Sequence, residues 1–168
     1  MSTRNIVHIF SGTQGSGKTT SINNLIARNT ESNPEITSLV CSADHFFYKS
    51  GVYRIILRQL PLAHKECRQK YANGLEAGIP HIYVDNTNVE EKHVLPYVEL
   101  AERYGYTIKI FTVSCDPRIA FERNVHNVPQ RVINETQEKF NAILPFFAEG
   151  KKQGRWELIH LLTDYTHS

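Results

Sequence analysis

The sequence predicts an α/β fold of three layers, in which helices flank a parallel sheet of about five strands. Short apolar runs rich in β-branched residues alternate with longer mixed segments, which is the pattern of successive strand–helix–strand units. The chain has 168 residues, of which 40% are hydrophobic and 21% are charged, a composition typical of globular proteins. We therefore expect a single domain over residues 1–168. No apolar run approaches the roughly 18 residues of a membrane span, so we expect no membrane partner.

Five segments are predicted to form the strands, because each is short, apolar and bounded by polar or turn residues. They are residues 6–10, 37–41, 81–84, 106–113 and 156–161. The segments between them predict helices over residues 18–29, 52–77, 90–104, 117–124 and 132–148. Asp116 and Pro117 suit the start of the fourth helix, because Asp caps a helix and Pro fits its first position.

Proline and glycine predict where these elements are interrupted. Pro61 lies inside the second helix and is expected to kink or break it there. Asn73-Gly74 and residues 78–80 are expected to form the turn into the third strand. Residues 149–155 contain two glycines and predict a turn before the last strand.

A glycine-rich segment joins the first strand to the first helix, and its sequence is Gly12-Thr13-Gln14-Gly15-Ser16-Gly17-Lys18-Thr19. It fits the phosphate-binding pattern G-x-x-x-x-G-K-[ST] in the strand–loop–helix context that the pattern requires. Glycines allow successive backbone N–H groups to face phosphate oxygens, and the helix N-terminus adds a partial positive charge. Lys18 is expected to reach the β- and γ-phosphates, and the Thr19 hydroxyl to ligate Mg²⁺. We count Thr20 among the nucleotide-binding residues as well.

Two of the predicted strands lead into aspartates, Asp44 and Asp85. Ligands of doubly wound sheets bind outside the carboxyl ends of the strands, so acids there are candidates for function. Either carboxylate could hold Mg²⁺, directly or through water, and either could accept a proton from a substrate hydroxyl. The alternative is that each aspartate only caps a turn.

The order and spacing of several short strings resemble the polynucleotide kinase-type P-loop kinases, which have an AAA-type ATP-binding kinase domain. This group includes the 5′-hydroxyl polynucleotide kinases of phages and the kinase-like domains of larger RNA- and DNA-processing proteins. The resemblance runs from about Ile6 to about Leu144. Its main strings are Ser42-Ala43-Asp44-His45-Phe46-Phe47, Gly51-Val52-Tyr53, Ala63-His64-Lys65-Glu66-Cys67, Val84-Asp85-Asn86-Thr87-Asn88 and Arg123-Asn124 with Val128-Pro129.

The resemblance implies ATP- and Mg²⁺-dependent transfer of the γ-phosphoryl group to a hydroxyl, usually the 5′-OH end of a nucleic acid. It implies that Asp44 is the general base and that Asp85 organises the site behind the phosphate loop, with Asp85 and Thr19 near the metal. Asp44, Asp85 and Asn88 then belong to the substrate site. Arg123 resembles the arginine that begins a lid over residues 123–131, where a guanidinium would neutralise the transferring phosphate. A solvated helix residue paired with a nearby acid is the alternative for Arg123.

The sequence departs from this pattern at two places. Many relatives have a second aspartate where this chain has His45, which leaves the role of that position open. A further lid arginine that relatives place soon after the Arg-Asn pair is missing from residues 125–127, and either Arg118 or Arg131 could replace it.

The net charge of +2 hides an uneven distribution. Residues 45–75 contain six Lys and Arg and one Glu, a local charge of +5, which leaves −3 for the rest of the chain. Arg54 and Arg58 are four residues apart and share one helical face, so we include both among the substrate-binding candidates. The stretch is typical of a surface for a phosphate-rich acceptor. An ordinary solvated helix is the alternative.

We therefore expect a kinase of a nucleic-acid hydroxyl, with the 5′-OH end of DNA or RNA as its acceptor. Alternatives are a kinase of a nucleoside, a small metabolite or a hydroxylated base in DNA, and a nucleotide-binding module without transfer activity. The three isolated cysteines match no metal spacing and indicate a reducing, cytoplasmic location. The oligomeric state is left open.

Overall fold

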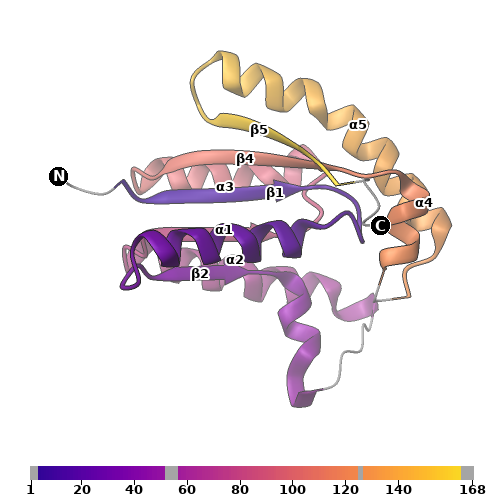
Figure 1. The fold of residues 1–168 in the computed structure, drawn as a ribbon, viewed down its shortest axis with the longest axis horizontal. Coiled ribbons are helices and arrows are strands. Elements are labelled where there is room, and N and C mark those ends of the chain that lie inside the picture. Colours follow the sequence, from indigo (N-terminus) through magenta and orange to yellow (C-terminus); the bar gives the residue numbers. More distant parts are fainter. Residues whose placement is uncertain (1–3, 52–56, 125–126, 164–168) are drawn as a thin grey trace.

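A computed structural model of the chain describes residues 4–51, 57–124 and 127–163, and its centre is a five-stranded sheet (Figure 1). The strands lie in the order β2-β3-β1-β4-β5, and all four neighbouring pairs are parallel. Their bounds are β1 Ile6–Ser11, β2 Ser38–Cys41, β3 His81–Asp85, β4 Thr107–Ser114 and β5 Glu157–Leu162. The predicted α/β fold with a parallel sheet is confirmed, and each strand lies within about one residue of its prediction.

Helices cover the two faces of the sheet. They are α1 Lys18–Ser32, α2 Leu60–Glu76, α3 Glu91–Arg103, α4 Pro117–Arg123 and α5 Gln130–Lys152, with 3₁₀ turns η1 Ala43–Gly51 and η2 Leu57–Gln59. Side chains of α2, α3 and α5 pack with Val7 and Ile9 of β1 on one face, whereas Ile22 of α1 packs with Phe10 on the other. The alternation of neighbouring strand residues between the two faces produces the three layers. Among the described residues, no helix is long and apolar enough to cross a membrane.

The helix boundaries follow the sequence where proline or a cap decides them. Pro61 occupies the first turn of α2, so the predicted break at this position is confirmed. The predicted cap of α4 is also confirmed, because the Asp116 carboxylate accepts a hydrogen bond from the Arg118 backbone N–H at 2.8 Å. The 3₁₀ turn η1 was not predicted, and residues 52–56 of the predicted long helix lie outside the described residues.

Two glycines that were expected to mark turns lie inside helices instead. A Cβ added at Gly74 of α2 would lie 2.5 Å from a Leu39 methyl, and one at Gly150 of α5 would lie 1.8 Å from the Trp156 ring. The predicted turns at 73–74 and at 149–152 are therefore wrong, because these glycines allow a helix to pack closely against a neighbouring side chain. The real turn before β5 lies after Lys152 and uses Gly154, whose φ is 76°.

Candidate active site

The phosphate loop follows β1 and is held in a tight turn by its glycines. Gly15 has a φ of 76°, and Gly17, which precedes α1, has a φ of 104°. The loop is also packed from outside, because a Cβ added at Gly15 would lie 2.1 Å from the carbonyl oxygen of Ala120 in α4. The Ser16 N–H donates to the Thr13 carbonyl at 3.2 Å within the loop. Only glycine combines this conformation with this approach.

The described part of the loop fits a polyphosphate. The Thr13 and Ser16 hydroxyls are buried without a hydrogen-bond partner among the described residues, so both can donate to phosphate oxygens. The N-terminus of α1 carries neither a side-chain cap nor an acidic residue in its first turn. Hydroxyls, backbone N–H groups and the positive end of the helix dipole are therefore gathered at one place, which is the donor set of nucleotide phosphate sites.

Lys18 lies over this loop with only 8% of its surface exposed. Its ammonium donates to the carbonyls of Gly12 at 3.0 Å and Thr13 at 2.8 Å. Burial lowers the pKa of Lys18, and the negative charges of Asp85 and Asp44 act in the opposite direction. Both sequence-predicted carboxylates therefore lie close enough to this ammonium to favour its charged form.

Asp85 and Thr19 form the part of the site that suits a magnesium ion. The Thr19 hydroxyl donates to an Asp85 carboxylate oxygen at 2.7 Å, which joins the end of β3 to the start of α1. Among the described residues, no group of three or more His, Cys, Asp or Glu side chains could hold a metal by itself. One hydroxyl and one carboxylate beside a phosphate loop are the ligands with which proteins hold Mg²⁺ together with nucleotide phosphates.

The residues that follow Asp85 connect three loops of the site. The Thr87 carbonyl accepts from the Gly12 N–H at 3.0 Å, which fixes the start of the phosphate loop. Asn88, with a φ of 48°, donates from its amide to the Phe10 carbonyl at 2.7 Å and accepts from the Ser11 hydroxyl at its own carbonyl at 2.8 Å. Asn88 is buried and bound to β1, and its expected contact with substrate stays a prediction.

Asp44 lies in the first turn of η1, directly after β2. The preceding N–H, that of Ala43, donates to the Asn86 side-chain oxygen at 2.9 Å, and the Asp44 N–H donates to the Ser42 hydroxyl at 3.2 Å. The Asn86 amide also donates to the Cys67 sulfur at 3.6 Å, which connects this loop to α2. Side chains from β3 and α2 therefore set the position of Asp44.

Arg123 ends α4 and turns toward the carboxyl ends of β4 and β5. It donates to the Thr163 hydroxyl at 3.4 Å and to the Cys115 sulfur at 3.7 Å. The Thr163 hydroxyl in turn donates to the Ser16 carbonyl of the phosphate loop. Arg123 is therefore within two hydrogen bonds of the phosphate loop, and it is exposed.

The predicted lid, residues 123–131, is described except for residues 125 and 126. The Asn124 amide donates to the Val128 carbonyl at 2.7 Å, which closes this connection between α4 and α5. The two candidates for a second lid arginine are exposed and paired locally, Arg118 with Asp116 at 3.4 Å and Arg131 with Glu135 at 3.1 Å. Exposed pairs of this kind are weak and exchange readily.

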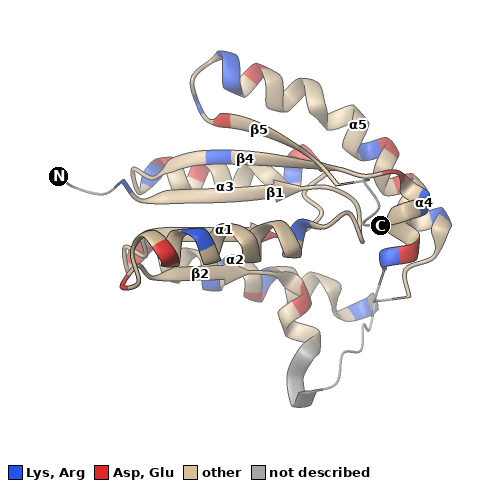
Figure 2. Cartoon of the chain, in the orientation of Figure 1, with Lys and Arg blue, Asp and Glu red and all other residues tan. Residues whose placement is uncertain are grey.

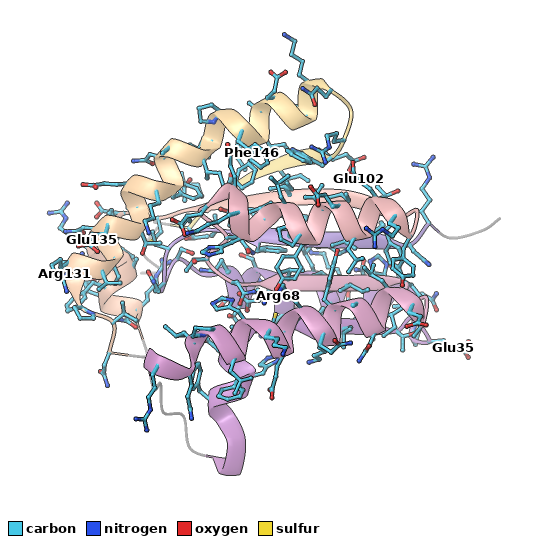
Figure 3. The ribbon with its side chains drawn as sticks, turned by 180° about the vertical axis from the view of Figure 1, so that it is seen from behind. Glu35, Arg68, Glu102, Arg131, Glu135 and Phe146 are labelled. Atoms are coloured by element: carbon cyan, nitrogen blue, oxygen red, sulfur yellow. The ribbon has the colours of Figure 1, made fainter. Side chains whose placement is uncertain are left out.

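The described part of the basic stretch, residues 45–51 and 57–75, lies on η1, η2 and α2, and Figure 2 shows positive residues interspersed with negative ones along α2. Arg58, Lys65 and Arg68 are exposed, whereas Arg54 lies outside the described residues. Arg68 lies on the α3 side of α2 (Figure 3). Lys70 is on another side of α2 and donates to the Val40 carbonyl of β2 at 2.7 Å.

Sequence reasoning missed the roles of Asn86 and Thr163. Asn86 belongs to a recognised string, but nothing in that string indicates that its side chain holds the loop of Asp44. Thr163 follows the carboxyl end of β5, so the strand-end rule that selected the aspartates could also have selected it.

Residues 7–144 match the model of the AAA domain family. The human protein NEDD4-binding protein 2 is 27% identical over 140 residues, a match that covers 80% of this chain and 8% of that protein. The chain thus spans a small part of that relative's length.

Several solved structures share the fold. A complex of AvrRxo1-ORF1 and AvrRxo1-ORF2 with sulphate ions has a TM-score of 0.71 at 14% identity, over 95% of this chain and 55% of that one. The Pnkp1/Rnl/Hen1 RNA repair complex has a TM-score of 0.67 at 15% identity, over 88% of this chain and 47% of that one. The APS kinase CysC of Mycobacterium tuberculosis, in complex with AMPPNP and APS, has a TM-score of 0.53 at 13% identity, over 98% and 92%.

At these identities the structural likeness establishes the fold alone, whereas the family model matches most of the chain. Together with the parallel sheet and the phosphate loop, it shows that the chain belongs to the AAA domain family and has a P-loop kinase-like fold.

Proposed function

We propose that the protein transfers the γ-phosphoryl group of ATP, with Mg²⁺, to a hydroxyl of a nucleic acid, and that the acceptor is the 5′-OH end of DNA or RNA. The observation that carries this proposal is a pair of hydrogen bonds that connects the loop of Asp44 to the phosphate loop. The N–H of Ala43, which precedes Asp44, donates to Asn86 at 2.9 Å, and the adjacent Asp85 accepts from Thr19 of the phosphate loop at 2.7 Å. A hydroxyl that contacts Asp44 would therefore lie on the side of the site where that loop would hold its phosphates.

The residues divide the work of this reaction. The loop N–H groups and Lys18 would bind the phosphates, and Lys18 would exchange its two carbonyl contacts for phosphate oxygens. Thr19 and Asp85 would hold Mg²⁺, which when bound neutralises charge on the phosphates. Asp44 would orient the acceptor hydroxyl and accept its proton as the new phosphate ester forms. Arg123 would place its guanidinium on the transferring group after leaving Thr163.

The charge of the acceptor side supports a nucleic acid. Arg58, Lys65 and Arg68 are exposed on η2 and α2, which come after η1 and its Asp44 in the chain. Exposed positive side chains on these elements suit an acceptor with several phosphates. One structure with this fold is that of the Pnkp1/Rnl/Hen1 RNA repair complex, which is consistent with such an acceptor.

Transfer of labelled γ-phosphate to 5′-OH DNA and RNA oligonucleotides tests the proposal. We expect Asp44→Asn to lower kcat by about 100-fold or more with ATP binding unchanged, because a positioned general base contributes at least that factor. Lys18→Ala should lose ATP binding, whereas Glu138→Gln, an exposed change on α5, should behave as the wild type. Unchanged turnover of Asp44→Asn would remove Asp44 from the role of base.

A small hydroxyl compound is the second candidate acceptor. It is favoured by the likeness to the APS kinase structure, because the match covers 92% of that chain. The same labelled ATP, offered to nucleosides and to APS, separates the two candidates. Transfer to one of these compounds with none to oligonucleotides would establish the small acceptor. ATP binding without any labelled product would establish a nucleotide-binding module.

A further inference from the structure

A pocket of about 400 Å³ lies between the β2–η1 connection and α2. Its volume is in the range typical of small-molecule sites. Its polar and aromatic lining residues are Ser42, His45 and Phe46 from the strand end and η1, and Glu66, Gln69, Lys70 and Asn73 from α2.

The pocket adjoins Asp44 directly. Ser42 and His45, the lining residues on either side of the Ala43-Asp44 pair, contribute to one wall, and the Ser42 hydroxyl accepts from the Asp44 N–H at 3.2 Å. The charges of Asp85 and Asp44 also reach His45, where they partly offset the lowering of its pKa by burial. A molecule whose hydroxyl contacts Asp44 would therefore place its neighbouring atoms at the mouth of this pocket.

The lining suits a flat, polar group without net charge, because its two charged residues, Glu66 and Lys70, have opposite signs. His45 and Phe46 supply two rings, and Gln69 and Asn73 supply amides that are hydrogen-bonded to each other at 2.9 Å. The ammonium of Lys70 is held by the Val40 carbonyl at 2.7 Å. Rings for stacking with amides for edge contacts are the groups that bind nucleobases.

The groups that suit phosphate lie on a different side of α2. Arg68 lies near His64 and Tyr97, on the α3 side of the helix, and it does not line the pocket (Figure 3). The pocket, in which Glu66 and Lys70 offset each other, therefore lies on a different side of α2 from Arg68. A nucleotide with its sugar hydroxyl at Asp44 would place its base in the pocket and could direct its phosphate toward Arg68.

We propose that this pocket binds the base of the nucleoside that carries the acceptor hydroxyl. This inference rests on the proposed function, because it takes Asp44 as the point where the hydroxyl is held. The affinity for the acceptor then depends on whether the terminal nucleoside has a base. It depends little on which base is present, because every base can stack on an aromatic ring.

Equilibrium binding of 5′-OH oligonucleotides to the full chain, with AMPPNP and Mg²⁺ present, tests this inference without requiring turnover. The two probes are identical except that one has an abasic site at its 5′ terminus. We expect the abasic probe to bind the wild type about 5- to 150-fold more weakly, which is the range for one stacked base.

A matched pair of substitutions locates the effect. In Gln69→Trp an indole occupies the pocket, whereas Gln137→Trp makes the same change at another helical glutamine bonded to an asparagine four residues later. We expect Gln69→Trp to remove the difference between the two probes and Gln137→Trp to leave it intact. Equal wild-type affinities for the two probes would overturn the inference, and so would a difference that survives Gln69→Trp.

The failure of this inference is distinguishable from that of the proposed function. If both probes are phosphorylated and bind with equal affinity, the proposed kinase activity stands and the base pocket is overturned. If binding depends on the base but no acceptor is phosphorylated, the base pocket stands and the kinase activity is overturned. Competition by a free nucleoside, with no binding of either oligonucleotide, would support a base pocket and overturn the nucleic-acid acceptor.

Discussion

The clearest quantitative prediction concerns His8, which lies in β1 under α1 and is 4% exposed. Its ring stacks on Tyr83 at 4.3 Å between ring centres, and its Nε2 lies 2.9 Å from Nδ1 of His81. Burial, with smaller contributions from the nearby His81 and Lys109, lowers the pKa of His8 from 6.5 to about 3. The folded protein therefore holds His8 neutral where the unfolded chain would protonate it.

The sign and size of the effect follow from these two pKa values. Below the unfolded value the unfolded chain binds a proton that the folded protein refuses, so stability falls as pH decreases from about 6.5 toward about 3. The whole difference corresponds to about 5 kcal/mol, and roughly 2 kcal/mol of it is already lost at about pH 5. Burial also lowers the pKa of His81, so His81 adds to the effect in the same direction.

Urea unfolding between about pH 7.5 and about pH 5 measures this loss, and His8→Phe should remove about 2 kcal/mol of the pH dependence while keeping the ring stack. If His8→Phe does not fold, His8→Leu provides the same comparison of slopes. Gln137→Leu, which changes no titratable group, is the control and should keep the wild-type slope. A His8 variant that loses as much stability as the wild type over this range would refute the reasoning.

Three further predictions follow from single contacts. Asn86→Leu should slow phosphate transfer by about 10-fold or more with ATP binding unchanged, because it leaves the first N–H of η1 without its hydrogen-bond acceptor. Asn86→Asp keeps that acceptor oxygen and should recover most of the rate in the same assay. Gly15→Ala should weaken ATP binding, measured by calorimetry, by about 10-fold or more, because its Cβ would meet a backbone carbonyl of α4. Gly154 has the same φ of 76°, but a Cβ there would meet no atom within 4 Å. Gly154→Ala should therefore lower the free energy of unfolding by about 1 kcal/mol and leave ATP binding intact. Gly150→Ala should lower the free energy of unfolding by about 1–3 kcal/mol through its clash with Trp156, and a smaller residue at position 156 should make the two changes strongly non-additive in a double-mutant cycle.

The phosphate loop and the strand ends could be predicted because their signals are local. Glycine at positions 15 and 17 is required by the positive φ of each residue, and the strand before the loop is visible as an apolar run. The same reasoning failed at Gly74 and Gly150, because a glycine in a turn and a glycine at a close helix contact have the same local sequence signal. Only the packing of Leu39 of β2 against Gly74, and of Trp156, which precedes β5, against Gly150, separates the two cases.

The sequence by itself determined the α/β fold, the phosphate loop and the two aspartates, since hydrophobic period, turn chemistry and the strand-end rule depend on neighbours along the chain. The tertiary structure decided what holds these residues in place. Asn86 fixes the loop of Asp44, Thr163 joins Arg123 to the phosphate loop, and α2 presents the pocket on a different side from Arg68. The physical reason is that these hydrogen bonds join residues that are 40 or more positions apart in the sequence. The place of the pocket depends in turn on which side of α2 faces the sheet.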